Sequence, residues 1–180
     1  SASPTFNART DRLEPLGAAN GYQHLWLRAS ASGAANKNLS FTWLNKNRFY
    51  TYTALAQDGL DVLLTQLGAN DPNFNLRHEQ ALVLRVNEAQ EQSFVSVLEP
   101  HGEYNGPAEY TIGSRSSIAD LQRFHVDGAD IIRITTKRGQ HYLALSYDPT
   151  ADVSHKVSAD GRDFAWRGYY GLFDQNGVKR

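Results

Sequence analysis

The stretch DIIRITTKRGQHYLALSY, residues 130–147, carries the clearest fold signal in the sequence. Two runs rich in β-branched, aromatic and aliphatic residues, Asp130–Thr136 and Gln140–Tyr147, flank the short connection KRG. Gly139 closes this connection, and glycine tolerates the backbone angles that tight turns require. The stretch therefore predicts an antiparallel β-hairpin.

Similar short runs recur along the chain between turn signals, which is typical of an all-β protein. The further predicted strands are Tyr22–Ser30, Leu39–Leu44, Arg48–Ala54, Leu60–Leu67, Gln80–Val86 and Gln92–Glu99. The last two are separated only by the polar stretch NEAQE, so they are predicted to form one hairpin. Another hairpin is predicted where SADG separates SHKV from RDFAWRGYYGLF.

Helix is expected to be scarce. In Ser116–Phe124 an apolar residue recurs at every third position, but the segment is too short for a stable helix and is predicted to be a strand or a sheet edge. The predicted fold class is therefore all-β, an antiparallel β-sandwich with little or no helix. The alternative is an open multilayer sheet of the same strands.

The length of 180 residues predicts one domain over residues 1–180, since a chain of this size removes about two-thirds of its unfolded surface from water. Trp26, Trp43 and Trp166 lie among alternating apolar residues and are predicted to belong to the core.

The composition narrows the range of possible binding partners and cellular compartments. The net charge is −1, from 18 basic and 19 acidic residues without long runs, so neither nucleic acid nor a membrane surface is an expected partner. No apolar window approaches the ~20 residues of a membrane span, and the N-terminus has no signal-peptide pattern.

The chain has no cysteine, which excludes disulfides and thiolate chemistry but fits the bacterial periplasm and cytoplasm equally, so the localisation stays open. Because the chain has no methionine, Ser1 is interpreted as an internal boundary, although removal of an initiator methionine would give the same start.

A polar cluster, LGANDPNFNLRHE, occupies residues 67–79. Asp71–Asn73 has the composition of a type I turn. In an extended chain Asn75, Arg77 and Glu79 then point to one side. One interpretation is a solvated face with an Arg77–Glu79 ion pair; the other is a carboxylate-binding edge, in which Arg77 grips the carboxylate and Asn75 a hydroxyl.

A second polar cluster, EPHGEYNGPAEY, occupies residues 99–110. His101, Glu103 and Tyr104 are candidates for an acid, a base or a metal ligand, and the alternative is a surface turn rich in proline and glycine. The spacing matches no zinc signature, so neither a metal nor a cofactor is predicted.

Tyr50 and Tyr52 share one side of a predicted strand, as do Tyr22, His24 and Trp26. An aromatic row of this kind can stack against sugar rings, and the alternative is that it belongs to the core.

Three segments carry a family resemblance: LGANDPNFNLRHE, FVSVLEPHGEYN and DIIRITTKRGQHYLALSYD. They resemble the C-terminal β-sandwich region of the heparinase II/III-like polysaccharide lyases. The sequence is most similar to the oligoalginate lyases of polysaccharide lyase family seventeen, from about Gly21 to Tyr170.

That family joins an N-terminal (α/α) toroid to β-sheets and cleaves uronic-acid polymers by β-elimination. The resemblance implies that this chain is the C-terminal domain of an alginate lyase and supports the catalytic toroid. The family's catalytic asparagine and histidine lie in the toroid, and its tyrosine acid and structural zinc site lie in the first part of the β region. No segment here matches those motifs, so the resemblance implies no catalytic residue in this chain.

The implied partners are a uronic-acid oligosaccharide such as alginate, the toroid domain, and further copies of the protein in a homo-oligomer. Two alternatives remain open at this point, an independent carbohydrate-binding module and an oligomer-assembly domain. The candidate substrate-binding residues are Asn75, Arg77, His101 and Tyr104.

Overall fold

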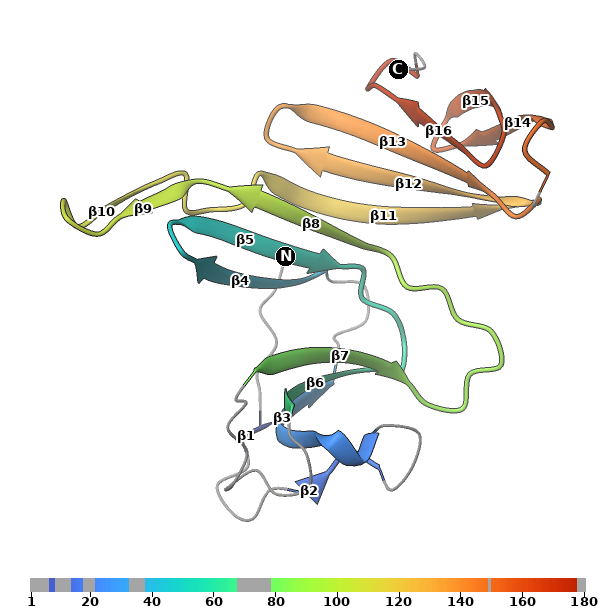
Figure 1. The fold of residues 1–180 in the computed structure, drawn as a ribbon. Coiled ribbons are helices and arrows are strands. Elements are labelled where there is room, and N and C mark those ends of the chain that lie inside the picture. Colours follow the sequence, from blue (N-terminus) through green and yellow to red (C-terminus); the bar gives the residue numbers. More distant parts are fainter. Residues whose placement is uncertain are drawn as a thin grey trace. The chain divides into compact units, whose positions relative to one another are not determined.

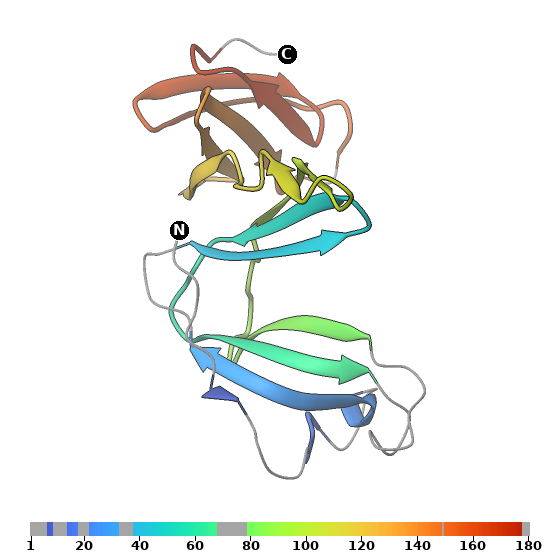
Figure 2. The ribbon, with the colours of Figure 1, turned by 90° about the vertical axis from the view of Figure 1, so that its left-hand side faces the viewer.

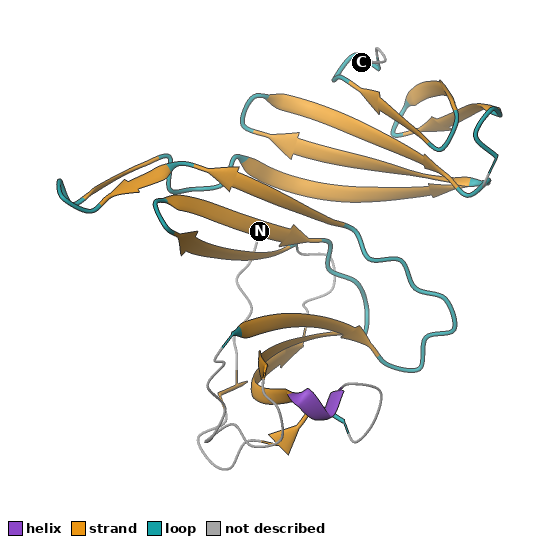
Figure 3. Ribbon diagram, in the orientation of Figure 1, coloured by secondary structure: helices purple, strands orange, loops and turns teal. Residues whose placement is uncertain are grey.

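The computed structural model describes residues 7–8, 14–17, 22–32, 38–67, 79–148 and 150–177. Over these residues the chain forms antiparallel strands and one 3-10 turn, η1 (Tyr22–His24) (Figure 3). The predicted class, all-β and antiparallel with little or no helix, is confirmed.

The chain divides into two compact units. The N-terminal unit takes residues 2–39 and 56–93, and the C-terminal unit takes residues 40–55 and 94–180. The chain therefore passes from one unit to the other after residues 39, 55 and 93. The expectation of a single domain over residues 1–180 stays a prediction.

The N-terminal unit is one five-stranded sheet with the strand order β1-β3-β6-β7 and β2 paired to β3 (Figure 1). Its strands are β1 (Asn7–Ala8), β2 (Glu14–Pro15), β3 (Leu25–Ser32), β6 (Leu60–Leu67) and β7 (Gln80–Val86). The central strand β6 buries side chains on both faces of the sheet, among them Leu60, Val62, Leu63 and Thr65.

The predicted hairpin between Gln80–Val86 and Gln92–Glu99 is wrong. β7 pairs with β6, whereas β8 (Ser96–His101) pairs with β5 (Arg48–Ala54). Because β6 is buried on both faces, its backbone groups need a hydrogen-bonded neighbour along each edge, and β3 and β7 provide them. β7 thus pairs with the strand that precedes it, and β8 pairs with a strand of the C-terminal unit.

The predicted strand Tyr22–Ser30 begins later than expected. Tyr22–His24 form η1, and only the following residues pair as β3. Tyr22, His24 and Trp26 therefore do not share one side of a strand, and that predicted row is wrong.

The C-terminal unit contains a three-stranded sheet, β4-β5-β8, and a four-stranded sheet, β11-β12-β13-β16 (Figure 1). Two further hairpins complete it, β9–β10 and β14–β15. The bounds not yet given are β4 (Leu39–Asn45), β9 (Glu103–Asn105), β10 (Tyr110–Ile112), β11 (Ile118–Val126), β12 (Ala129–Thr136), β13 (Gly139–Ser146), β14 (Ser154–Ala159), β15 (Arg162–Arg167) and β16 (Tyr170–Phe173). β11 confirms the prediction of a strand over Ser116–Phe124.

An apolar cluster joins the four-stranded sheet to the β14–β15 hairpin. Its buried members are Ala129, Ile131, Tyr142, Ala144, Phe164, Trp166 and Phe173. The Phe164 ring lies at the centre, with its centroid 5.1 Å from the ring centroids of both Tyr142 and Phe173. Two β layers therefore pack face to face here, as in a β-sandwich.

The three tryptophans do not share one environment. Trp166 is 4% exposed and belongs to the core as predicted, and Trp26 is partly buried. Trp43 is 45% exposed, so its assignment to the core is wrong. It lies on β4, an edge strand of the three-stranded sheet, on the opposite side from Thr42, whose hydroxyl bonds to the buried Thr51.

The hairpins predicted around Gly139 and SADG are confirmed. In the second, Asp160 and Gly161 connect the strands with φ angles of 51° and 70°, which is the pattern of a two-residue type I′ turn. Arg133 Nη1 lies 2.6 Å from Asp160 Oδ2, and the Tyr142 hydroxyl donates to the same oxygen at 2.9 Å. Burial opposes ionisation of Asp160, but the bonds from Arg133 and Tyr142 outweigh it and lower its pKa. The turn is thereby fixed to β12 and β13.

We expect Phe164→Ala to lower the free energy of unfolding by about 3–5 kcal/mol, because it removes a fully buried ring from the centre of the cluster. Urea-induced unfolding followed by circular dichroism measures the change. The matched control is Phe94→Ala, at a ring that is 49% exposed, where the change should stay within about 0.5 kcal/mol. Equal losses in the two variants would contradict the assignment of this core.

Candidate functional site

The four candidate residues from the sequence fall in different places. Asn75 and Arg77 lie outside the described residues, and their role in substrate binding stays a prediction. His101 is the last residue of β8, and Tyr104 lies in β9.

The His101 ring is fixed by hydrogen bonds on both of its nitrogens. Nδ1 lies 2.9 Å from the Gly113 carbonyl oxygen, which only accepts, so Nδ1 carries a proton and donates. In the neutral ring Nε2 then accepts from the Thr51 hydroxyl at 2.8 Å, and Thr51 accepts from the Thr42 hydroxyl at 2.7 Å. The ring also stacks on Phe49, with 6.0 Å between the ring centroids. This series of hydrogen bonds connects β4, β5 and β8 through their side chains.

Glu99 is the second polar anchor of β8. Its carboxylate accepts from the hydroxyls of Ser116 and Ser117 and from the Ser117 backbone N–H, the last at 3.1 Å. Burial raises the pKa of Glu99, but the hydrogen bonds from both serines outweigh burial, so its pKa is lowered. The ionised carboxylate thus attaches β8 to the start of β11.

Tyr104 lies in a different local environment from His101. It lines a pocket of about 480 Å³ beside the β4–β5 turn. The lining residues are Leu44, Lys46, Asn47, Glu103, Tyr104, Asn105, Gly106 and Pro107. The pocket offers an ammonium, a carboxylate and a phenol, but His101 is not part of its wall. The structure therefore does not bring the two described candidates into one site.

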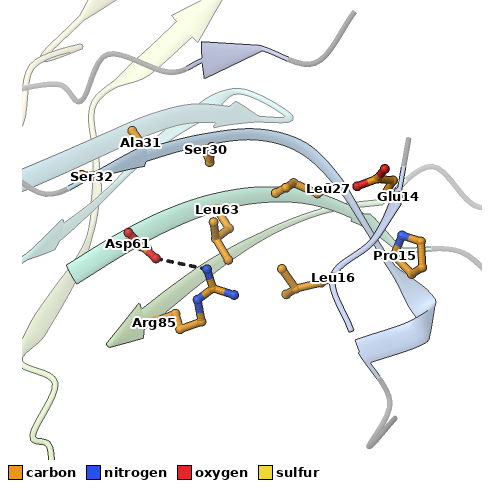
Figure 4. A pocket seen from close by; sticks show the side chains of 10 residues that line it. All are labelled: Glu14, Pro15, Leu16, Leu27, Ser30, Ala31, Ser32, Asp61, Leu63 and Arg85. Carbon is orange, nitrogen blue, oxygen red and sulfur yellow. Dashed lines mark hydrogen bonds and ion pairs between the residues drawn. The ribbon is translucent and has the colours of Figure 1, made fainter. Parts of the chain in front are cut away.

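The N-terminal unit has a pocket of its own, about 310 Å³ in volume, between β2, β3, β6 and β7 (Figure 4). Arg85 is its cation, and its Nη2 lies 3.1 Å from Asp61 Oδ2. The amide of Asn87 donates to the same oxygen at 3.1 Å. The charge of Arg85 is thus compensated inside the pocket.

A row of rings, exposed at Trp43 and partly buried at Tyr50 and Tyr52, lies on the three-stranded sheet of the C-terminal unit, whose β4–β5 hairpin is cyan in Figure 2. The Trp43 and Tyr50 rings stack, with 5.8 Å between centroids and 15° between planes. Across the sheet, Tyr50 pairs with Pro100 and Tyr52 pairs with Leu98. Directly opposed residues share one side of a sheet, so these five residues form one surface, called here the aromatic face.

Tyr50 and Tyr52 were predicted from the sequence, whereas Trp43 was predicted to belong to the core. The sequence signal for the position of Trp43 is the short link Lys46-Asn47, which folds β4 back onto β5. A two-residue link sets the register of a hairpin, and this register is what places Trp43 beside Tyr50.

A cluster around Asp130 was not predicted. The Asp130 carboxylate is buried, with Arg123 Nε at 2.9 Å and His125 Nδ1 at 3.2 Å from its Oδ1. The Tyr147 hydroxyl lies 3.1 Å from the same nitrogen of His125 and accepts from Arg123 at 3.2 Å. Burial raises the pKa of Asp130, but the bonds from Arg123, Tyr147 and His125 outweigh it and lower this pKa. The Asp127-Gly128 turn sets the β11–β12 register that places His125 opposite Asp130, so this dipeptide was the available signal.

Among the described residues, no group of three or more histidines and carboxylates is arranged to hold a metal ion. The described part of the chain also contains no helix long and apolar enough to span a membrane.

Comparison with known proteins relates the chain to polysaccharide-degrading enzymes. No family model matches the sequence. The chain is 42% identical over 162 residues to an exo-oligoalginate lyase of Saccharophagus degradans. The aligned segment covers 87% of this chain and 22% of that enzyme. It is 41% identical over 162 residues to an alginate lyase of Stenotrophomonas maltophilia. Here the aligned segment covers 89% of this chain and 22% of that enzyme.

The class of protein to which the chain is related is therefore the lyases. More narrowly, the chain is a homologue of one segment of alginate lyases, and the predicted resemblance to oligoalginate lyases is confirmed. It spans about a fifth of the length of these relatives.

The Asp130 cluster predicts a pH-dependent loss of stability. Because the pKa of Asp130 is lowered in the folded state, its ionised form contributes stability that is fully present above its ordinary pKa of 3.8. This contribution is lost as the pH falls through the lowered folded pKa. We expect Asp130→Asn to lower the free energy of unfolding by about 1–3 kcal/mol at pH 7, and the difference from the unmodified chain to shrink at pH 3.

Urea titrations at pH 7, 5 and 3 measure this effect. Asp152→Asn is the control, because the Asp152 side chain is 85% exposed and its ion pair with Arg167 is solvated. A loss in Asp130→Asn that stays constant from pH 7 to pH 3 would contradict the stabilising role of the carboxylate charge.

Proposed function

We propose that this chain is a non-catalytic β-domain of an alginate lyase that supports the catalytic part of the enzyme. The observation that carries the proposal is the identity of 41–42% to a segment amounting to 22% of two alginate lyases. Most of each relative lies outside the matched segment, which leaves ample chain to carry a catalytic domain.

The geometry of the polar residues supports the same conclusion. β-Elimination on a uronic acid needs a group that neutralises the carboxylate, a base for the C5 proton and an acid for the departing oxygen, all within reach of one sugar. Among the described residues, His101 uses both ring nitrogens within the C-terminal unit, and Tyr104 lines a pocket that excludes His101. The proposal therefore assigns the chemistry to the remainder of the lyase.

The proposed partners follow from this role. The domain would attach to the catalytic toroid of the same polypeptide, and the substrate of the complete enzyme would be a uronic-acid oligosaccharide such as alginate. An oligomer-assembly role is the competing proposal, and sedimentation of the complete lyase with and without these residues separates the two. A change in the number of subunits favours assembly, and unchanged oligomeric state with lower stability favours support.

We expect the isolated chain to release no unsaturated product from alginate, heparin or hyaluronan, whereas the complete lyase acts on alginate oligomers. The product carries a C4–C5 double bond conjugated to the carboxylate, so ultraviolet absorbance measures turnover. The physical reason is that catalytic groups act as a unit, and activity falls steeply when even one of them is missing.

The complete lyase is the positive control in this assay. Steady release of unsaturated uronate by the isolated chain, abolished in His101→Ala or Tyr104→Phe, would overturn the proposal and make residues 101–104 an active site.

A further inference from the structure

We infer that the aromatic face is a binding site for uronic-acid oligomers, in which the exposed Trp43 ring, backed by Tyr50, stacks on a sugar ring and Arg48 binds the carboxylate of that sugar. The choice of ligand rests on the proposed function, since alginate is a polymer of uronic acids. The binding surface itself follows from the side chains of β4, β5 and β8.

Strand geometry places Arg48 on the aromatic face. Alternate residues of a strand share one side, so Arg48 lies on the same side of β5 as Tyr50 and Tyr52. By the same rule Asn45 lies on the same side of β4 as Trp43. The stacking of Trp43 on Tyr50 joins the two sets on one surface.

The opposite side of the sheet is occupied by contacts within the C-terminal unit. Thr51 and Thr53 on β5 are each only 1% exposed, and Thr51 bonds to Thr42 and His101. On the aromatic face Trp43 is 45% and Leu98 56% exposed, whereas Tyr50 and Tyr52 are partly buried. Exposed apolar surface rimmed by polar groups marks an interaction site.

The aromatic rings of Trp43 and Tyr50 form a surface on which a sugar ring can stack. A pyranose has an apolar face of C–H groups and a polar rim of hydroxyls, so it can pack its face on an aromatic ring while the hydroxyls stay in water. The planes of Trp43 and Tyr50 differ by only 15°, and the exposed part of the indole is available to a ligand.

Charge favours an acidic sugar over a neutral one. Arg48 is exposed, and its side chain forms no ion pair or hydrogen bond with the residues that the structure describes. A guanidinium binds a carboxylate through two parallel hydrogen bonds. Arg48 and Tyr50 are two residues apart on one strand, about 6.6–6.8 Å, so one uronate can stack on the rings and direct its carboxylate towards Arg48. The amide of Asn45, at the same end of the hairpin, can bond a hydroxyl.

Titration of the isolated chain with alginate oligomers, followed by tryptophan fluorescence and by calorimetry, tests the site. We expect binding that weakens with added salt, and no comparable binding of a neutral β-1,4-glucan oligomer. Trp43→Ala should weaken binding about tenfold or more, because truncating a central aromatic of a binding surface costs this much. Arg48→Gln should reduce the affinity for the alginate oligomer and remove the salt dependence.

Two controls lie on exposed positions elsewhere in the C-terminal unit. Tyr170→Ala removes a ring that is 60% exposed on β16, and Arg138→Gln removes an exposed charge from the β12–β13 turn. Both variants should bind as the unmodified chain does. Trp43→Phe should keep binding by calorimetry but lose the fluorescence change, which assigns the signal to this ring.

The outcomes separate this inference from the proposed function. If the chain binds no alginate oligomer while the complete lyase still degrades alginate, the inference is overturned and the proposed function stands. If the complete lyase does not act on alginate but the chain binds another uronate polymer through Trp43 and Arg48, the proposed function fails and the inference stands. Sedimentation in which Trp43→Ala abolishes self-association, with no sugar binding by either form, would make the face a contact between copies and overturn the sugar site.

Discussion

The pleat of β5 is the constraint on which both surfaces of the three-stranded sheet depend. It sends Thr51 and Thr53 to the buried side and Tyr50 and Tyr52 to the aromatic face. Because β5 lies between β4 and β8, its inward hydroxyls and outward rings meet partners from both neighbours. A shift of one residue in its pairing would exchange the two faces and bury the tyrosines where the hydroxyl chain now lies. The ligand surface and the buried contacts are therefore set by one register.

The C-terminal unit is held together in two physically different ways. Between the four-stranded sheet and the β14–β15 hairpin, the contact is made mainly by aromatic rings around Phe164. Along β8, by contrast, His101 and Glu99 make hydrogen bonds to neighbouring segments. Burying polar groups costs free energy unless they are paired, so these bonds require defined positions of Thr51 and Ser117. The apolar contact buries side chains between two β layers, and the polar contacts fix the register.

Local signals in the sequence were sufficient for some elements and not for others. Arg48–Ala54, Leu60–Leu67 and Gln80–Val86 have the predicted bounds, because each is rich in β-branched, aromatic or aliphatic residues and begins directly after a polar or turn residue. The pairing of β8 with β5 was not predicted, because it joins segments more than 40 residues apart and no local sequence signal indicates it. Trp43 was misplaced for a related reason: an apolar residue in a strand is buried only if its side of the sheet is covered, and coverage is a tertiary property. Of the candidate site, the sequence identified Tyr50 and Tyr52. Arg48 lies on their side through the alternation of β5 itself, whereas Trp43 joined them only through the hairpin register.

The interleaving of the two units has a consequence for how the protein is made. The chain leaves the N-terminal unit after residue 39 to form β4 and β5, returns at residue 56, and leaves again after residue 93. On the ribosome β4 and β5 therefore emerge before β6 and β7, yet their sheet stays incomplete until β8 follows. The strands of the N-terminal unit can pair first. At that stage the β4–β5 hairpin extends from this unit, and Thr51 and Thr53, which are buried in the complete fold, are still exposed to water. No single cut of the polypeptide separates the two units, so proteolysis at one bond would leave strands of one unit attached to the other.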